Sequence, residues 1–146
     1  MRPRNVEACV SAARRERARR LARGVVFEEK YFGEPAWNIL LETYILTVEG
    51  QLAIMMKHLA APSRAPYSTF SRYVDLLEEQ GDVAREKTDV DGRYTLVRLT
   101  GQGRARIERC LSAMIEKEEQ FIAPHRYDRT RACLPDRAFD WAAQAA

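Results

Sequence analysis

The sequence has few of the residues that hold metals or disulfides, and it has no long hydrophobic run. Two histidines and three cysteines occur among 146 residues, and the cysteines, Cys9, Cys110 and Cys133, are odd in number and far apart. This pattern is neither a disulfide framework nor a metal-ligand set, and it fits a reducing compartment. Without an apolar run of about 20 residues the chain has no candidate membrane span, and its basic start lacks the hydrophobic segment of a secretory signal. We expect a cytoplasmic protein without a metal and without a membrane partner.

Sequence motifs of catalysis are also missing. Neither His58 nor His125 has a carboxylate at a spacing typical of acid–base catalysis, and the sequence contains no nucleophile elbow and no phosphate-binding glycine loop. We therefore expect no enzyme activity, no catalytic residue and no cofactor. A redox-active thiol is the remaining alternative, because Cys9 lies in an arginine-rich segment. Cys110 falls on an apolar helix stripe and is expected in the core.

Positive charge is concentrated at the start of the sequence. The net charge of the chain is only +3, but residues 1–24 hold eight arginines against two glutamates, a net +6 that leaves −3 for the remainder. Three interpretations of this basic run remain open: a solvated helix face, contacts with phosphates, or contacts with an acidic partner. With 46% hydrophobic and 31% charged residues, the chain suits one domain with a core and long exposed helices.

Hydrophobic periodicity predicts that most of the chain is helical. Residues 36–49 have the clearest pattern, because apolar residues at spacings of three and four predict a buried face. Gly33 and Pro35 separate this helix from a long one that is rich in alanine and arginine. Thr100 can cap another long helix, and Leu59 is expected to anchor a short one in the core. The predicted helices cover residues 6–32, 36–49, 54–61 and 101–122, with a short last helix within 135–146.

The most informative segment begins with a predicted helix at residues 66–80. Pro66 suits a first helical position, and Gly81 can end the helix in the left-handed conformation. One face of this helix is apolar and the opposite face is polar. The apolar residues are Phe70, Val74 and Leu77, and the polar ones are Ser68, Ser71, Arg72 and Asp75. Such a helix can pack on a core and still present side chains to a partner.

Two strand-like runs follow this helix, at residues 83–88 and 94–99. They flank a tip that contains the turn sequence Asp91-Gly92-Arg93. A helix followed by a two-stranded ribbon with a basic tip is the outline of a winged helix. In this outline the helix enters the major groove of DNA while the ribbon reaches along the backbone.

Two motifs in this segment resemble those of the MarR family of winged helix-turn-helix transcriptional regulators. The recognition-helix pattern of the family matches the run from Ser68 to Gly81, and its wing signature matches Asp91-Gly92-Arg93 followed by Leu99-Thr100-Gly101-Gln102-Gly103. The resemblance implies a fold that is mainly α with a small β-wing, in which long N- and C-terminal helices form a dimer. It implies one MarR-like domain over residues 1–146, with a winged-helix DNA-binding core at 35–100, dimerisation helices at 6–32 and 101–146, and a short third strand at 51–53.

The resemblance further implies a sequence-specific DNA-binding regulator, expected to be a homodimeric repressor. Its partners would be double-stranded DNA and a second copy of the chain. The helix at 66–80 would read the major groove, and the wing at 83–99 would lie on the minor groove and the backbone. Arg72 is expected to reach a base edge, and Arg93, braced by Asp91, is expected in the minor groove. The residues expected to bind DNA are Tyr67, Ser68, Thr69, Ser71, Arg72, Arg85, Lys87, Asp91 and Arg93.

The resemblance assigns other roles to the first helix and to the core. In the family the first helix belongs mainly to the dimer interface, so its arginines are not assigned to DNA. A small-molecule effector, whose identity the sequence does not specify, would bind between the dimerisation and DNA-binding parts. Its candidate walls are Tyr31, Trp37 and Tyr44.

Two residues depart from the family pattern. Pro62 shortens the helix before the turn. Asp82 replaces a leucine that tucks into the core, and it is therefore expected to point outward or to meet Arg85. Together with the acidic stretch at 75–79, these departures leave an alternative function open: a winged-helix module that binds proteins and does not bind DNA.

Overall fold

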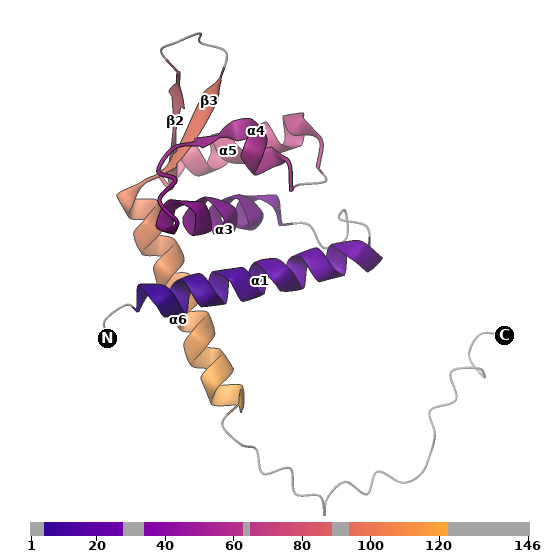
Figure 1. Cartoon of the computed structure of the whole chain (residues 1–146), viewed down its shortest axis with the longest axis vertical. Helices are drawn as coiled ribbons and strands as arrows, with labels where there is room; N and C mark the ends of the chain where they lie inside the picture. The colour runs from indigo at the N-terminus through magenta and orange to yellow at the C-terminus, as the bar shows by residue number, and fades with distance from the viewer. Residues whose placement is uncertain (1–4, 28–33, 63–64, 89–93, 123–146) are drawn as a thin grey trace, which may run out of the picture.

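The computed structural model describes residues 5–27, 34–62, 65–88 and 94–122, and Figure 1 shows how they are arranged. The helices are α1 (Val6–Val26), α3 (Pro35–Val48), α4 (Met56–Ala60), α5 (Tyr67–Glu79) and α6 (Gly101–Ile122). The strands are β1 (Ile54–Met55), β2 (Val83–Lys87) and β3 (Thr95–Leu99). The predicted fold class, mainly α with a small β-wing, is confirmed. None of these described helices is both long and apolar enough to cross a bilayer.

Helix α3 lies at the centre of the fold. Pro35 occupies its first turn, where the missing N–H costs nothing, and Leu41, Tyr44 and Ile45 are almost completely buried. Helix α3 contacts α1, α4, α5, α6 and β3, and in Figure 1 it lies between α1 on one side and α4 and α5 on the other. The helix predicted at 36–49 is therefore confirmed, and it is the element on which the others pack.

The three strands form one antiparallel sheet in the order β1-β3-β2. Strands β2 and β3 pair along their whole length, with Val83 opposite Leu99 at the base of the wing. Strand β1 adds the pair of Ile54 with Val97, and the side chains of Ile54, Val83 and Val97 are buried. The element order α3-β1-α4-α5-β2-β3 with this strand order is that of a winged helix-turn-helix.

The third strand lies later in the sequence than predicted. Residues 51–53 are exposed and do not pair in the sheet. They follow Gly50, whose φ of 100° turns the chain after α3 and is easily adopted only by glycine. Ile54 forms the strand instead, because it is 2% exposed and its side chain belongs to the core. The helix α4 that follows is shorter than predicted, although Leu59 is buried as expected.

Helix α1 packs on α3 and α6 and then extends past them. Its buried residues are small or β-branched, which lets the helices approach closely: Cys9, Val10, Ala12 and Ala13. Its C-terminal end reaches beyond α3 in Figure 1, and Leu21, Val25 and Val26 are 56%, 77% and 75% exposed there. The sequence predicts a helix to residue 32, whereas α1 ends at Val26; residues 28–33 lie outside the described part of the chain.

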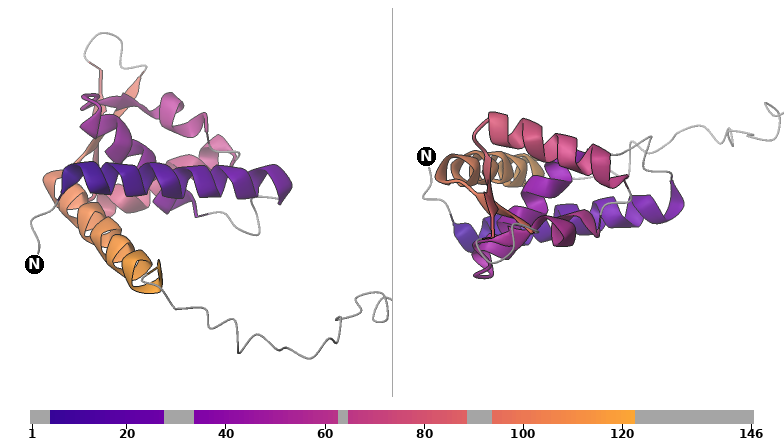
Figure 2. Two further views of the ribbon diagram at one scale, coloured as in Figure 1. Left: turned by 60° about the horizontal axis from the view of Figure 1, so that its bottom comes forward. Right: turned by 90° about the horizontal axis from the view of Figure 1, so that it is seen from above.

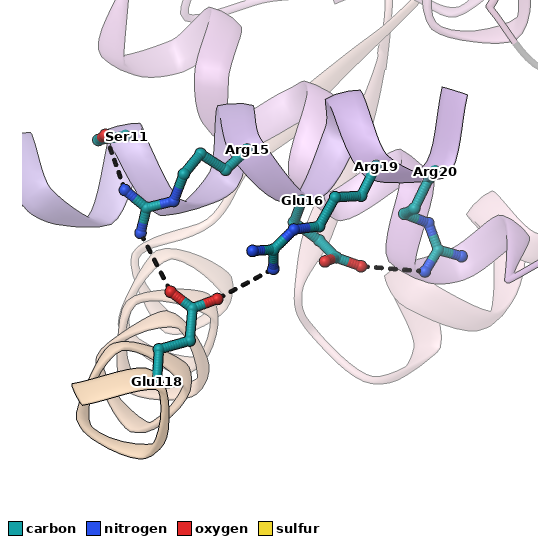
Figure 3. Close-up of polar contacts among 6 residues, drawn as sticks. All are labelled: Ser11, Arg15, Glu16, Arg19, Arg20 and Glu118. Atoms are coloured by element: carbon teal, nitrogen blue, oxygen red, sulfur yellow. Dashed lines mark hydrogen bonds and ion pairs between the residues drawn. The ribbon is translucent and has the colours of Figure 1, made fainter. Parts of the chain in front are cut away.

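Most arginines of α1 are paired with carboxylates of neighbouring segments. Figure 3 shows Glu118 of α6 accepting hydrogen bonds from Arg15 and Arg19, at 3.4 and 3.0 Å. Further ion pairs join Arg14 to Glu49, Arg17 to Glu42, and Arg20 to Glu16 and Glu34. Much of the basic run therefore fastens α1 to α3 and α6, and these arginines need no phosphate and no acidic partner to balance their charge.

Figure 1 places α1 and the wing on opposite sides of α3. Helices α4 and α5 lie on the side of α3 that faces away from α1, and strands β2 and β3 extend beyond them. Helix α6 begins at the base of the wing and runs past α1, with which it packs. The tip of the wing, with Asp91 and Arg93, and the predicted helix within 135–146 lie outside the described residues.

Candidate nucleic-acid interface

Helix α5 packs one face on the core and leaves the opposite face to solvent. Its buried residues are those that the sequence predicts: Phe70, Val74 and Leu77. Pro66 is the residue before the first turn, and none of the described side chains caps that turn. The first N–H groups of the helix therefore keep their capacity to donate hydrogen bonds. Gly81, with a φ of 77°, ends the helix as predicted.

The N-terminal half of α5 carries most of the residues predicted to bind DNA. Tyr67 is 58% exposed, Ser68 and Arg72 are also exposed, and Thr69 and Ser71 are half-buried. Arg72 is the only basic residue of α5, and it makes no ion pair with any residue that the structure describes. The helix thus presents one unpaired cation and several hydroxyl groups close to its unbonded N–H groups.

Arg85, in contrast, is held by two carboxylates of α5. Its Nη1 lies 2.6 Å from Asp75 Oδ1, its Nε donates to Glu78 Oε2 at 2.7 Å, and its backbone N–H donates to Glu78 Oε1 at 3.0 Å. The backbone hydrogen bond and the guanidinium of Arg85 lower the pKa of Glu78, and the bond with Glu78 raises the pKa of Arg85. The sequence places Arg85 among the DNA contacts, but in the structure its guanidinium fastens β2 to α5.

The wing has fewer unpaired cations than its sequence suggests. Lys87, at the end of β2, is exposed and makes no ion pair within the described residues. Arg98 of β3 pairs with Glu86 on the neighbouring strand, at 3.3 Å. The other two predicted wing contacts, Asp91 and Arg93, lie outside the part of the chain that the structure describes.

Lys57 and Tyr94 form a contact that sequence analysis does not identify. The Nζ of Lys57, in α4, lies 5.1 Å from the centroid of the Tyr94 ring, and both residues are exposed. The pairing of Ile54 with Val97 brings them together, because it sets the start of α4 beside the residue that precedes β3. This cation–π contact adds a positive charge beside the outer end of the two long wing strands.

Asp82 is buried, so the prediction that it points outward or meets Arg85 is wrong. It is 4% exposed, and both of its carboxylate oxygens accept hydrogen bonds from Nη1 of Arg106 in α6, each at 2.9 Å. A buried carboxylate needs a counter-charge. Arg106 supplies it from 24 residues further along the chain, and only the packing of α6 on the α5–β2 turn brings the two groups together.

The Leu-Thr-x-x-Gly motif holds the start of α6 against this same turn. The Thr100 hydroxyl donates to the Gly81 carbonyl at 2.6 Å and accepts from the Gly103 N–H at 2.9 Å, so Thr100 caps α6 as predicted. Gly103 approaches the backbone so closely that a Cβ added there would lie 2.0 Å from the Asp82 carbonyl oxygen. These signature residues therefore fix the junction of α5, β2 and α6.

Two of the three candidate walls of an effector site belong to described parts of the chain. Tyr44 is 0% exposed, and its hydroxyl lies 3.4 Å from Glu108 Oε1. Burial, followed by the nearby Glu108, raises the pKa of Tyr44, so Tyr44 is a neutral residue of the core. Trp37 is half-buried against the core, and Tyr31 lies outside the described residues.

The two described cysteines have different environments. Cys9 is buried, with its Sγ 3.7 Å from the Ser112 hydroxyl. Cys110 is exposed, so its predicted place in the core is wrong; its partial burial raises the pKa of its thiol, which makes the thiolate scarcer. Among the residues that the structure describes, no three potential metal ligands come together.

No protein-family model and no curated protein matches the chain. The chain is similar to the solved structure of AF1382 from Archaeoglobus fulgidus, with 25% identity, a TM-score of 0.48, and coverage of 66% of this chain and 94% of that one. It is similar to a probable transcriptional regulator from Pseudomonas aeruginosa, with 28% identity, a TM-score of 0.48, and coverage of 62% and 64%. It is also similar to the MarR family transcriptional regulator SPO1453 from Silicibacter pomeroyi DSS-3, with 27% identity, a TM-score of 0.43, and coverage of 80% and 81%.

Proposed function

We propose that the chain, whose winged helix resembles that of the MarR family, is a homodimeric, sequence-specific DNA-binding transcriptional regulator that acts as a repressor. Helix α5 reads the major groove, and the wing lies on the minor groove and the backbone. The observation that carries this proposal is the N-terminal half of α5. There Arg72 is exposed and makes no ion pair with the described residues, close to a first turn that no described side chain caps.

This end of α5 suits the two tasks of a DNA reader. Backbone N–H groups at the start of a helix can bind a phosphate oxygen and so set the position of the helix. Arg72 lies one turn further on and can donate two hydrogen bonds to a guanine, which is worth about 1–3 kcal/mol of discrimination. Asp75 and Glu78 would repel phosphates, but both carboxylates are paired with Arg85. That pairing supports an approach of α5 to DNA.

Cations beside α5 extend this surface toward the wing. Lys87 is exposed at the outer end of β2, and Lys57 is exposed on α4 above the Tyr94 ring. Each can neutralise a phosphate without selecting a sequence. By resemblance, Arg93 and Asp91 at the wing tip would contact the minor groove, as the sequence predicts.

The dimer is proposed on the apolar end of α1. A single winged helix reads too few base pairs for selective binding, and two copies about one DNA turn apart correct this. Leu21, Val25 and Val26 are all more than half exposed at the end of α1. Leu21 and Val25 are four residues apart, so they share one face of the helix, and exposed large apolar side chains on one face are typical of a surface covered by a partner. A second copy of the chain fits the expected role of the terminal helices.

Duplex binding measured at increasing salt tests the proposal. Duplexes would first be enriched from a random-sequence pool with the full chain, and their affinity would then be measured at several salt concentrations. Phosphate contacts release counterions, so the logarithm of the binding constant should fall linearly with the logarithm of salt concentration, with a slope of about −0.9 for each contact. Absent binding, or binding that salt does not weaken, would favour the protein-binding module that the sequence leaves open.

A further inference from the structure

The turn between the proposed recognition helix and the wing is clamped to the first two turns of α6. The Thr100 N–H donates to the Asp82 carbonyl at 3.1 Å, and the Gln102 side chain donates to the Gln80 carbonyl at 2.9 Å. Arg106 adds the ion pair with the Asp82 carboxylate. Backbone and side-chain contacts from Thr100, the residue before α6, and from two positions of α6 thus converge on residues 80–82.

Among these contacts, the ion pair between Asp82 and Arg106 depends most on the relative placement of the turn and α6. The Asp82 side chain is 6% exposed and the Arg106 side chain 47%, so the carboxylate is buried while the guanidinium reaches in from the surface. A buried carboxylate that loses its cation is strongly disfavoured, so Asp82 cannot leave Arg106 without a rearrangement of the turn. A leucine at position 82, as in the family pattern, would make an apolar contact with no such dependence on direction.

Helix α6 connects the turn after α5 with helix α1. It starts at the base of the wing and runs past α1 (Figures 1 and 2), and Glu118 joins it to two arginines of α1 (Figure 3). Since α6 packs on α1, a movement of α5 against α6 would also change the position of α5 relative to α1.

We infer that Asp82 and Arg106 are positioning residues for DNA recognition: their ion pair locks α5 to α6, so that α6 sets the spacing of the two α5 helices in the dimer. This inference rests on the proposed function. If each α5 is held in one orientation on its α6, the dimer binds only duplexes with one distance between the two half-sites. If α5 can rotate against α6, the dimer binds duplexes with several such distances. The pair thus determines which spacing the dimer selects and does not itself touch DNA.

Half-site spacing is the first measurement. Duplexes enriched by the wild-type chain would be altered by one base pair at a time between their half-sites, and affinity would be compared for wild type, Arg106→Gln and Arg109→Gln. Arg109 is exposed on the same helix, so its variant controls for the change in charge. We expect the affinity ratio between the best and the displaced spacing to fall by about tenfold in Arg106→Gln, which corresponds to about 1.4 kcal/mol, and to stay constant in Arg109→Gln.

An equal loss of affinity at every spacing would mean that the ion pair only stabilises the fold, and it would overturn the inference. If Arg106→Gln does not fold, the double variant Asp82→Leu with Arg106→Leu replaces it, because apolar groups of similar volume often substitute for a buried ion pair without loss of stability. The double variant is expected to fold, to bind duplex and to tolerate displaced spacings. Retention of the wild-type spacing preference in the double variant would also overturn the inference.

Hydrogen exchange of the protein without DNA separates this inference from the proposed function. The Asp82 N–H is bonded to the Leu77 carbonyl at 2.9 Å, and the Thr100 N–H is bonded to Asp82. If the ion pair locks α5 to α6, both amides should exchange faster in Arg106→Gln and not in Arg109→Gln. Unchanged exchange would overturn the lock even where DNA binds. A wild-type chain that binds no duplex would instead overturn the proposed function and the role in spacing, while faster exchange would still establish the lock.

Discussion

Glu78 accepts two hydrogen bonds from a single residue, Arg85, one from the backbone N–H at 3.0 Å and one from Nε at 2.7 Å. The two residues belong to α5 and to β2, so this paired contact fixes the first strand of the wing against the helix. Asp75, one turn earlier in α5, completes the cluster through the Nη1 of Arg85. The cluster reduces the negative charge of the acidic half of α5 and holds the helix and the wing in one relative orientation.

The stability that Glu78 contributes should disappear in acid. Its pKa in the folded protein lies below the ordinary value of 4.5, first because the Arg85 N–H binds the carboxylate. A group with a lowered folded pKa stabilises the fold above its unfolded pKa, and this stabilisation is lost as pH falls through the folded pKa. We expect Glu78→Gln to lower the free energy of unfolding at neutral pH by about 1 kcal/mol or less, because the side chain is 35% exposed.

Thermal unfolding between neutral pH and about pH 3 measures this effect. The difference between wild type and Glu78→Gln should shrink steadily below about pH 4.5. Glu79→Gln is the matched control, since Glu79 is an exposed neighbour on the same helix. A difference that stays constant over the whole pH range would show that the ionised carboxylate of Glu78 is not the stabilising species.

Removal of Arg72 and removal of Lys87 should affect DNA binding in different ways. Arg72→Ala is expected to cost about 1–3 kcal/mol on enriched duplexes and to relax the base preference at one position, because a bidentate contact to a base edge is lost. Lys87→Ala is expected to weaken binding on all duplexes alike and to reduce the salt slope by about one. Binding constants on enriched and scrambled duplexes at several salt concentrations distinguish the two outcomes, and equal behaviour of both variants would reject these roles.

Local patterns in the sequence predict the elements of this fold well. The apolar stripe of α5, the glycine that ends it and the Thr100 cap of α6 all depend on residues within a few positions of one another, and all are confirmed. Spacing alone cannot place residues that meet across the fold. The third strand begins at Ile54 because that side chain fits opposite Val97 in the sheet, and periodicity over residues 51–55 does not contain this information.

The partners of charged residues are the part of the candidate site that the sequence does not reveal. A basic residue in a wing is an expected DNA contact, but the sequence does not show which carboxylates lie beside it. Arg85 meets residues seven and ten positions earlier in the chain, across the end of α5. Arg106 meets Asp82 only because α6 returns to the α5–β2 turn. Each pairing depends on tertiary packing, so it follows from the fold and not from the local sequence.

Gly103→Ala should destabilise the protein, although a glycine-to-alanine change in a helix is usually stabilising. The added Cβ would lie 2.0 Å from the Asp82 carbonyl oxygen, a backbone atom that cannot move without shifting the turn. Overpacking of this kind costs about 1–3 kcal/mol or more. Gly101→Ala is the control, because no atom lies within 4 Å of a Cβ at that position, and alanine there should be neutral or stabilising. Denaturant unfolding of both variants tests the prediction, which equal midpoints would contradict.

Val25→Glu should weaken the proposed dimer without unfolding the protomer. Val25 is 77% exposed at the end of α1, so the protomer alone loses little when this side chain becomes charged. A dimer that covers it would have to bury an unpaired carboxylate, which is costly. The dissociation constant of the dimer should therefore rise by about tenfold or more.

Leu52→Glu is the matched control. Leu52 is also exposed, at 57%, but it lies between α3 and β1 and away from the surface proposed for the partner. Sedimentation at micromolar concentration should then report a dimer for wild type and Leu52→Glu and a larger monomer fraction for Val25→Glu. A wild-type monomer would contradict the homodimer itself, whereas a dimer unaffected by Val25→Glu would move its interface away from this end of α1.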